Sequence, residues 1–201
     1  MSAADIEGGI LRGVPRWTPD ARARLQDAAE DLVAERGFDA VTAAEIAAAV
    51  GVTERTFFRH FADKREALFG REAEMHEALV AGVRSVPAGA PVHDAVAAGL
   101  AAVGEALQPR RTALRRRDAL IGAHAALRER ELVKLEATAV ALAAALEERG
   151  VPAPHARLAA ELAVTVLRVA FGRWIARSER RPYAAVIAEA FDEAGAVFGP
   201  S

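Results

Sequence analysis

The segment VTAAEIAAAVGVTERTFFRHFADK, residues 41–64, decides the fold because it holds the start and stop signals of consecutive short helices. Thr42 with Glu45 three residues later is the pattern of a capping box, which predicts a helix beginning just after Thr42. Gly51 can adopt the left-handed conformation of a tight turn, and Thr53 is suited to cap the helix that follows. Two short helices joined by such a turn form a helix-turn-helix.

The apolar residues of this segment predict a small core that leaves one helix face free. Ala47 is small enough for two steeply crossing helices to approach each other. A helix whose outer face stays open in this way can lie in the major groove of DNA, with its first residues at base edges and its flanks at phosphates. The larger residues expected to fill the core are Ile46, Val50, Val52, Phe57 and Phe61.

Helix signals continue on both sides of the segment. Residues 1–17 are expected to form a flexible arm, after which Thr18-Pro19 starts a helix that Gly37 ends. We therefore predict an all-α fold of about nine helices. A helix-turn-helix DNA-binding domain (18–62) is followed by a larger helical regulatory and dimerisation bundle (63–201). Prolines and glycines delimit the later helices, which are expected at 63–85, 91–107, 110–123, 125–149, 154–178 and 183–198.

Composition agrees with a helical protein and excludes several other classes. The chain has 201 residues, of which 52% are hydrophobic and 5% aromatic, and alanine fills many of the apolar positions. It has no cysteine, and its start lacks a signal-peptide pattern, so we expect a cytoplasmic protein without disulfides. Glu161 and Arg168 interrupt the longest apolar stretches, which argues against a membrane span.

The net charge of −2 does not by itself favour DNA, so a DNA-binding prediction depends on where the positive charges lie. Residues 55–65 carry four basic side chains and a single acidic one. This basic segment includes most of the second helix of the helix-turn-helix, which is where phosphate contacts are needed.

The run from Gly51 to Lys64, followed by Leu68, closely resembles the TetR family of regulators, and so do residues 37–47. The resemblance covers roughly residues 18–69. It implies phosphate contacts at the two helix starts, and base and phosphate contacts along the second helix. One position departs from the family, because Phe58 replaces a tyrosine whose hydroxyl usually meets a phosphate; Arg59 is placed to supply that contact instead. The residues expected at DNA are Thr42, Thr53, Arg55, Thr56, Phe58, Arg59, His60 and Lys64.

Each of these residues also has a simpler explanation. Thr42 and Thr53 are helix caps whether or not DNA is bound. Arg55 and Arg59 can be merely solvated, and His60 can pack at the edge of the core. Against this, Arg55 stands where the family often has a smaller residue, and an arginine there can read guanine through two hydrogen bonds.

The C-terminal part resembles TetR-type regulatory domains, and residues 115–130 and 190–194 resemble the mycofactocin-type subgroup. This resemblance implies an acyl-CoA-like ligand. Five arginines between residues 110 and 117 either receive a CoA phosphate or form an exposed helix face. For any single apolar residue of the expected pocket, a place in the plain core is the simpler explanation. A buried histidine with its hydrogen bonds satisfied is likewise the simpler explanation of His124. The pocket is expected to include Val103, Leu107, Leu120, Ile121, His124, Thr138, Phe171 and Trp174.

The last two helices, 154–178 and 183–198, are expected to form a two-fold dimer seam, although some of their apolar residues must face the chain's own core. Candidates for the seam are Val164, Leu167, Phe171, Val186, Ile187, Phe191 and Phe198.

We therefore predict a ligand-responsive transcriptional regulator. The resemblance to the TetR family of repressors implies a repressor rather than an activator. It binds a palindromic operator as a homodimer and is released by a small, largely apolar effector, with acyl-CoA as a candidate. No cofactor, metal or membrane partner is predicted. An enzyme is the first alternative, but a carboxylate metal site needs repeated Glu-x-x-His patterns, and only residues 72–76 come near one. A helical adaptor that does not bind DNA is the second, and the basic helix argues against it.

Overall fold

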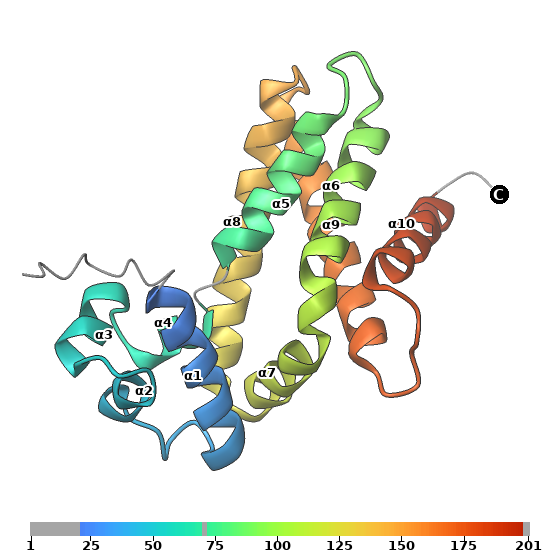
Figure 1. The fold of residues 1–201 in the computed structure, drawn as a ribbon. Coiled ribbons are helices and arrows are strands. Elements are labelled where there is room, and N and C mark those ends of the chain that lie inside the picture. Colours follow the sequence, from blue (N-terminus) through green and yellow to red (C-terminus); the bar gives the residue numbers. More distant parts are fainter. Residues whose placement is uncertain (1–20, 70–71, 199–201) are drawn as a thin grey trace, which may run out of the picture.

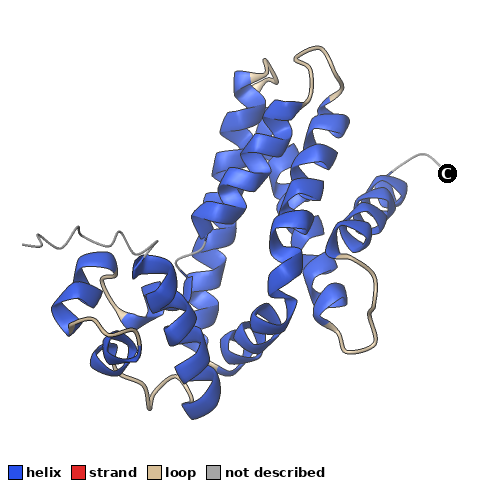
Figure 2. Ribbon diagram, viewed as in Figure 1, coloured by secondary structure: helices blue, strands red, loops and turns tan. Residues whose placement is uncertain are grey.

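The computed structural model describes residues 21–69 and 72–198, and all regular structure in these two ranges is helical, with ten α-helices and one short 3-10 helix (Figure 2). The predicted all-α fold is therefore confirmed. The arm expected at 1–17 and the Thr18-Pro19 cap lie outside the described residues. The helix expected at 63–85 corresponds to two helices, with residues 70–71 between them also outside the described part.

Four short helices form the N-terminal lobe in Figure 1. The capping box at Thr42 is confirmed, because its hydroxyl accepts from the Glu45 N–H at 3.2 Å while its own N–H donates to the Glu45 carboxylate at 2.9 Å. Gly51 takes a φ of 74°, which lets the chain turn between two helices. At the next helix start the side chain of Asp63 accepts from the Glu66 N–H at 2.8 Å, and the Glu66 carboxylate accepts from the Ala62 N–H at 2.6 Å. The helices are α1 (Ala21–Arg36), α2 (Ala43–Ala49), α3 (Glu54–His60) and α4 (Lys64–Phe69).

The core of this lobe extends into the second domain. Ile46, Phe57 and Phe61 are at most 1% exposed, as the sequence predicts. The same buried cluster includes Ile121 and Leu127 from the regulatory bundle. Because the two domains share apolar packing, a change in the bundle can reach the helix-turn-helix directly.

The regulatory bundle is elongated, with its longer helices running roughly alongside one another and α7 crossing at the end near the N-terminal lobe (Figure 1). Most observed bounds agree with the expected ones to within one residue. No helix in the described ranges is long and apolar enough to cross a membrane. The helices are α5 (Glu72–Ser85), α6 (Val92–Leu107), the 3-10 helix η1 (Gln108–Arg110), α7 (Arg111–Ala123), α8 (Ala125–Glu148), α9 (Ala153–Ile175) and α10 (Tyr183–Phe198).

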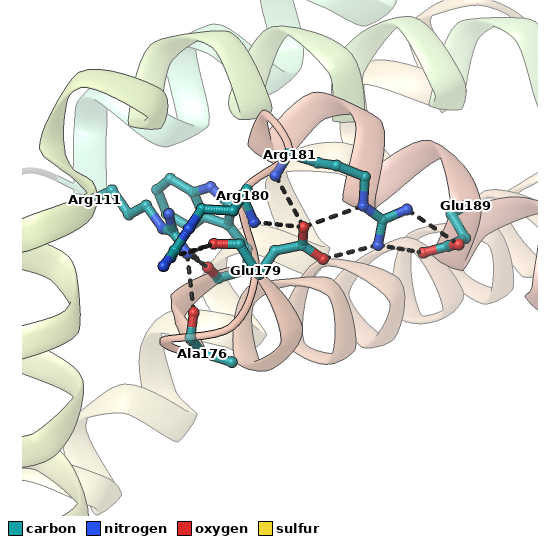
Figure 3. Close-up of polar contacts among 7 residues, drawn as sticks. Arg111, Ala176, Glu179, Arg180, Arg181 and Glu189 are labelled. Atoms are coloured by element: carbon teal, nitrogen blue, oxygen red, sulfur yellow. Dashed lines mark hydrogen bonds and ion pairs between the residues drawn. The ribbon is translucent and has the colours of Figure 1, made fainter.

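Helix α9 ends earlier than the expected residue 178, and Arg111 accounts for the difference. Its guanidinium donates to the carbonyls of Trp174, Ala176 and Glu179 at 2.6–3.0 Å. These bonds satisfy the carbonyls left free where the helix ends and fasten the loop to α7 (Figure 3). Arg181 braces the same loop through Glu179. Arg111 is far from this helix end in the sequence, so local helix signals did not indicate its role in ending α9.

Close approach of α6 and α10 requires glycine. A Cβ added at Gly104 would lie 2.6 Å from the Ala184 backbone. Nearby, the rings of Trp174 and Tyr183 stack at 4.4 Å, and the Tyr183 hydroxyl donates to the Leu167 carbonyl at 3.1 Å. These contacts hold α10 against the bundle and bury aromatic rings on the far side of the cavity described below.

Candidate DNA-binding surface and effector cavity

The outer face of α3 is exposed and carries most of the residues expected at DNA. The hydroxyl of Thr53 caps the helix by accepting from the Thr56 N–H at 3.2 Å. Arg55 and Arg59 are exposed. Phe58 is 53% exposed and meets the buried Phe57 only with its edge, so it belongs to the surface rather than to the core. The face therefore offers two arginines and a projecting aromatic ring.

Two of the expected DNA residues are engaged inside the domain. The ammonium of Lys64 donates to the carbonyls of Phe38 and Val41, at 2.7 and 3.0 Å, and lies over the Phe38 ring. Lys64 thus ties α4 to the chain segment before α2. The Nε2 atom of His60 is buried. In this arrangement neither the Lys64 ammonium nor the Nε2 atom of His60 is presented to a phosphate.

Arg22 and Arg24, for which the sequence allows an exposed helix face or a minor-groove contact, fasten α1 to the ends of α3 and α2. Arg22 donates to the His60 carbonyl at 2.7 Å, with its guanidinium over the Phe61 ring. Arg24 donates to the Val50 carbonyl at 2.7 Å. Because both bonds go to carbonyls at the ends of α2 and α3, these arginines also complement the negative ends of the helix dipoles.

Thr42 is exposed at the start of α2, beside a network centred on Glu45. Hydrogen bonds from the side chain of Arg36 and from Thr42 lower the pKa of Glu45 to about 2. The carboxylate is therefore charged at neutral pH and keeps the Thr42 cap ordered. A negative charge at this position does not attract a phosphate, so a contact there would have to come from the hydroxyl or the backbone N–H groups.

A cavity of about 410 Å³ lies within the regulatory bundle and reaches the N-terminal lobe. Four of the residues expected in a pocket do line it: Leu107, Ile121, Thr138 and Phe171.

The other four expected pocket residues lie elsewhere. Val103 and Trp174 are completely buried in the core of the bundle. Leu120 lines only a smaller neighbouring hollow. His124 is the N-cap residue of α8, where its ring contacts Phe38. An apolar periodicity does not distinguish a residue that faces a cavity from one that faces another side chain, which explains these misplacements.

The side of the cavity next to the N-terminal lobe is charged. Arg110 donates to both carboxylate oxygens of Glu30 on α1, at 2.9 and 3.1 Å. Arg117 donates to Glu131 at 2.7 Å and to the Leu68 carbonyl at 3.2 Å. Arg111 caps α9, so three of the five arginines at 110–117 have partners within the chain: Arg110, Arg111 and Arg117. They do not form the uniformly exposed helix face that the sequence left open.

Lys134 completes this charged wall and was not predicted from the sequence. Its side chain is 11% exposed and lies 3.9 Å from Glu131, with the ammonium 4.3 Å from the centre of the Phe69 ring. Burial lowers its pKa to about 7. The available signal was its spacing on α8, which places it one helical turn after Glu131 and one turn before Thr138.

Thr138 is fully buried in the cavity wall and fully hydrogen-bonded. Its hydroxyl lies 2.7 Å from the Nε2 atom of His76 and donates to the Lys134 carbonyl at 2.9 Å. Burial lowers the pKa of His76, which favours the neutral ring in this bond. In the described part of the chain, no group of three or more acidic, histidine or cysteine side chains is placed to hold a metal ion.

The expected dimer residues divide into two sets. Val164, Leu167, Val186 and Ile187 are at most 7% exposed and belong to the chain's own core. Phe191 is half-buried and stacks on His93 with ring centres 4.8 Å apart. The side chain of Phe198 lies outside the described residues.

A different row of α9 presents apolar side chains to solvent. Leu158, Leu162 and Val169 are 59%, 40% and 42% exposed. Their spacing of four and seven residues places them on one face of the helix. This row, rather than the buried set, is the apolar surface that α9 can offer to another molecule.

The described residues thus combine a helix-turn-helix that has an exposed basic helix with a helical bundle that contains a cavity. Residues 25–70 match the model of the family described as bacterial regulatory proteins, tetR family. The match identifies a tetR-type DNA-binding domain in residues 25–70, and the fold similarity given below extends over most of the chain.

Known proteins resemble this chain in part or in fold. The HTH-type transcriptional regulator TcmR of Streptomyces glaucescens is 31% identical over 96 residues, which cover 44% of this chain and 42% of TcmR. The chain thus matches less than half the length of this curated relative.

Solved structures extend the likeness to most of the chain. A TetR regulator from Nitrosomonas europaea superimposes with a TM-score of 0.60 at 16% identity, covering 87% of this chain and 96% of that one. The Thermus thermophilus repressor FadR, solved with lauroyl-CoA, superimposes with a TM-score of 0.58 at 22% identity, covering 90% of this chain and 96% of FadR. SmeT, the repressor of a Stenotrophomonas maltophilia multidrug efflux pump, superimposes with a TM-score of 0.60 at 17% identity, covering 89% of this chain and 90% of SmeT. At these identities the similarity establishes the fold.

Proposed function

We propose that this protein is a cytoplasmic transcriptional repressor that binds a palindromic operator as a homodimer and leaves it when a small, largely apolar effector enters the cavity. The observation that carries the proposal is the position of α4. This helix follows the recognition helix α3, and its last residues, Leu68 and Phe69, form part of the cavity wall. One short element therefore touches both the DNA-binding unit and the effector site.

On DNA, we assign base reading to the first turns of α3 and phosphate contacts to its flanks. Arg55 is exposed near the start of α3 and can reach the two acceptors of a guanine. Thr53 and Thr56 accompany it, and Arg59 supplies a phosphate contact one turn later. Phe58 is well placed for apolar contact with a sugar or a thymine methyl group.

The exposed row Leu158, Leu162 and Val169 supports pairing through α9 and α10. A two-fold axis beside this row would bring the same side chains of two copies together and bury them. Two recognition helices would then contact half-sites about 34 Å apart, or one turn of DNA. Because a single half-site supplies limited binding energy, a dimer is needed for tight binding.

For the effector we propose an acyl-CoA-like molecule, as in the mycofactocin-type subgroup. The support is an apolar cavity with a cationic side, together with the lauroyl-CoA bound to the Thermus thermophilus neighbour. An effector releases DNA only if it binds the DNA-incompetent conformation more tightly. To shift the two conformations from 99:1 in favour of the DNA-competent one to 1:99, the effector must bind the DNA-incompetent conformation more favourably by about 5.5 kcal/mol.

The test has two stages. Selection of bound DNA from a random pool with the full chain should return a palindromic site with half-sites one turn apart. Gel shifts on that site should then show release by acyl-CoAs, tested beside free fatty acids and planar aromatic compounds. A non-palindromic site would contradict the dimer model, and failure of all compounds to release DNA would contradict the sensory role.

A further inference from the structure

We infer that the effector carries an anionic head group, which Arg117 and Lys134 bind at the end of the cavity formed by the DNA-binding domain, while its apolar part fills the rest. The inference rests on the proposed role of the cavity as the effector site. It goes further by stating the orientation of the ligand in the cavity and the residues that recognise its charged end.

The charges that line the cavity favour an anion. Four arginines and Lys134 line it together with three carboxylates, so the wall has a positive excess even when Lys134 is uncharged. Two of the carboxylates are already used, since Glu30 pairs with Arg110 and Glu131 lies between Arg117 and Lys134. Buried positive charge that shares its counter-ions is stabilised by an additional anion.

Arg117 and Lys134 are the two cations best placed to bind it. Their side chains are 12% and 11% exposed, so water screens them little. Both lie against the ring of Phe69, with the Arg117 guanidinium at 4.7 Å and the Lys134 ammonium at 4.3 Å from its centre. A carboxylate or phosphate oxygen entering beside this ring would meet two donors at once.

The rest of the lining suits an apolar tail. Leu107, Leu135 and Phe171 come from α6, α8 and α9 and line the cavity away from the N-terminal lobe. Leu132 also lines it and is 62% exposed, so the cavity reaches solvent beside α8. The arrangement fits an amphipathic molecule that inserts with its charged end toward α4.

This orientation provides a reason for the release of DNA. Arg117 holds the end of α4 through the Leu68 carbonyl, and the Phe69 ring contacts both cations. Hydrogen bonds from a cation to an anion are stronger than those to a neutral carbonyl, so an anion competes for the groups that hold α4. At its other end α4 is tied to the segment before α2 through Lys64. A shift of α4 is thereby passed to the helix-turn-helix.

The inference is tested by titration calorimetry on the full chain with two probes of equal tail length, laurate and dodecanol. Laurate should bind at least about tenfold more tightly than dodecanol, because only laurate can pair with the two cations. Lys134→Met should remove most of that difference by weakening laurate alone, and Lys134→Arg should retain it. Arg115→Met, which removes a charge from the exposed face of α7, is the matched control and should change neither affinity.

Equal binding of the two probes to the natural chain would overturn the inference, and so would a Lys134→Met protein that still prefers laurate. Lauroyl-CoA identifies the source of the anion: binding tighter than laurate assigns the site to a CoA phosphate, and weaker binding assigns it to a free carboxylate. Operator release is measured separately. If laurate binds with the expected preference but DNA stays bound, the anion site stands and the proposed repressor response fails. If no probe binds, both fail.

Discussion

Replacing Lys134 by methionine should stabilise the fold at neutral pH, and the gain should shrink as the pH rises. The side chain is 11% exposed, and burial lowers its pKa from 10.5 to about 7. Between these two values the unfolded chain holds a proton that the folded chain lacks. The free energy of unfolding of the natural protein therefore increases with pH across this window, and below about pH 7 the full penalty of the buried lysine remains.

The size of the effect follows from the shift. Each unit of pKa corresponds to about 1.4 kcal/mol, so the shift of about 3.5 units bounds the penalty near 5 kcal/mol. Methionine fills a similar volume without a charge, and we expect Lys134→Met to gain about 2–4 kcal/mol at pH 7. For a chain of this size that corresponds to a rise in Tm of about 5–10 °C. The advantage should fall by about 1.4 kcal/mol per pH unit between roughly pH 8 and 10.

Urea unfolding of both proteins from about pH 6 to 10, at one protein concentration, measures this difference. Equal concentrations are needed because dimerisation contributes to apparent stability. Arg115→Met serves again as the control and should show no pH-dependent gain. A destabilised Lys134→Met protein, or an advantage that does not change with pH, would refute the assignment of a desolvated lysine to the cavity wall.

Three further predictions concern the DNA surface, the dimer and the cavity. Arg55→Ala should cost about 1–3 kcal/mol of operator-binding free energy and relax specificity at one base position. Arg59→Ala should weaken binding to all DNA sequences alike and lower by about one the slope of log affinity against log salt concentration. Binding to mutated operators over a salt series separates the two effects. Leu162→Asp should yield monomers in sedimentation and abolish tight operator binding, because it places a charge in the exposed apolar row of α9; a stable dimer would place the interface elsewhere. Leu135→Trp should fill the cavity and abolish effector release while operator binding persists, and unaltered release would show that the effector binds elsewhere.

Local sequence signals were sufficient for the helix starts and the turn of the helix-turn-helix. The Thr42–Glu45 box, the positive φ at Gly51 and the Thr53 cap all lie within a turn or two of the helix ends that they specify. The alternation between buried Phe57 and exposed Arg55 follows from helical periodicity alone. The caps and the turn could be predicted locally because they depend on backbone groups only three or four residues away.

Tertiary structure alone decided which apolar residues face the core, the cavity or solvent. Val164 and Leu162 are two residues apart on α9, yet the first is buried in the core and the second lies in the exposed row. Lys134 is buried where Phe69, far away in the sequence, packs against it. Lys64 and Arg111 likewise bond to carbonyls that other segments bring within reach. Such roles depend on which helices become neighbours, and that is settled by the packing of the whole chain rather than by any local pattern.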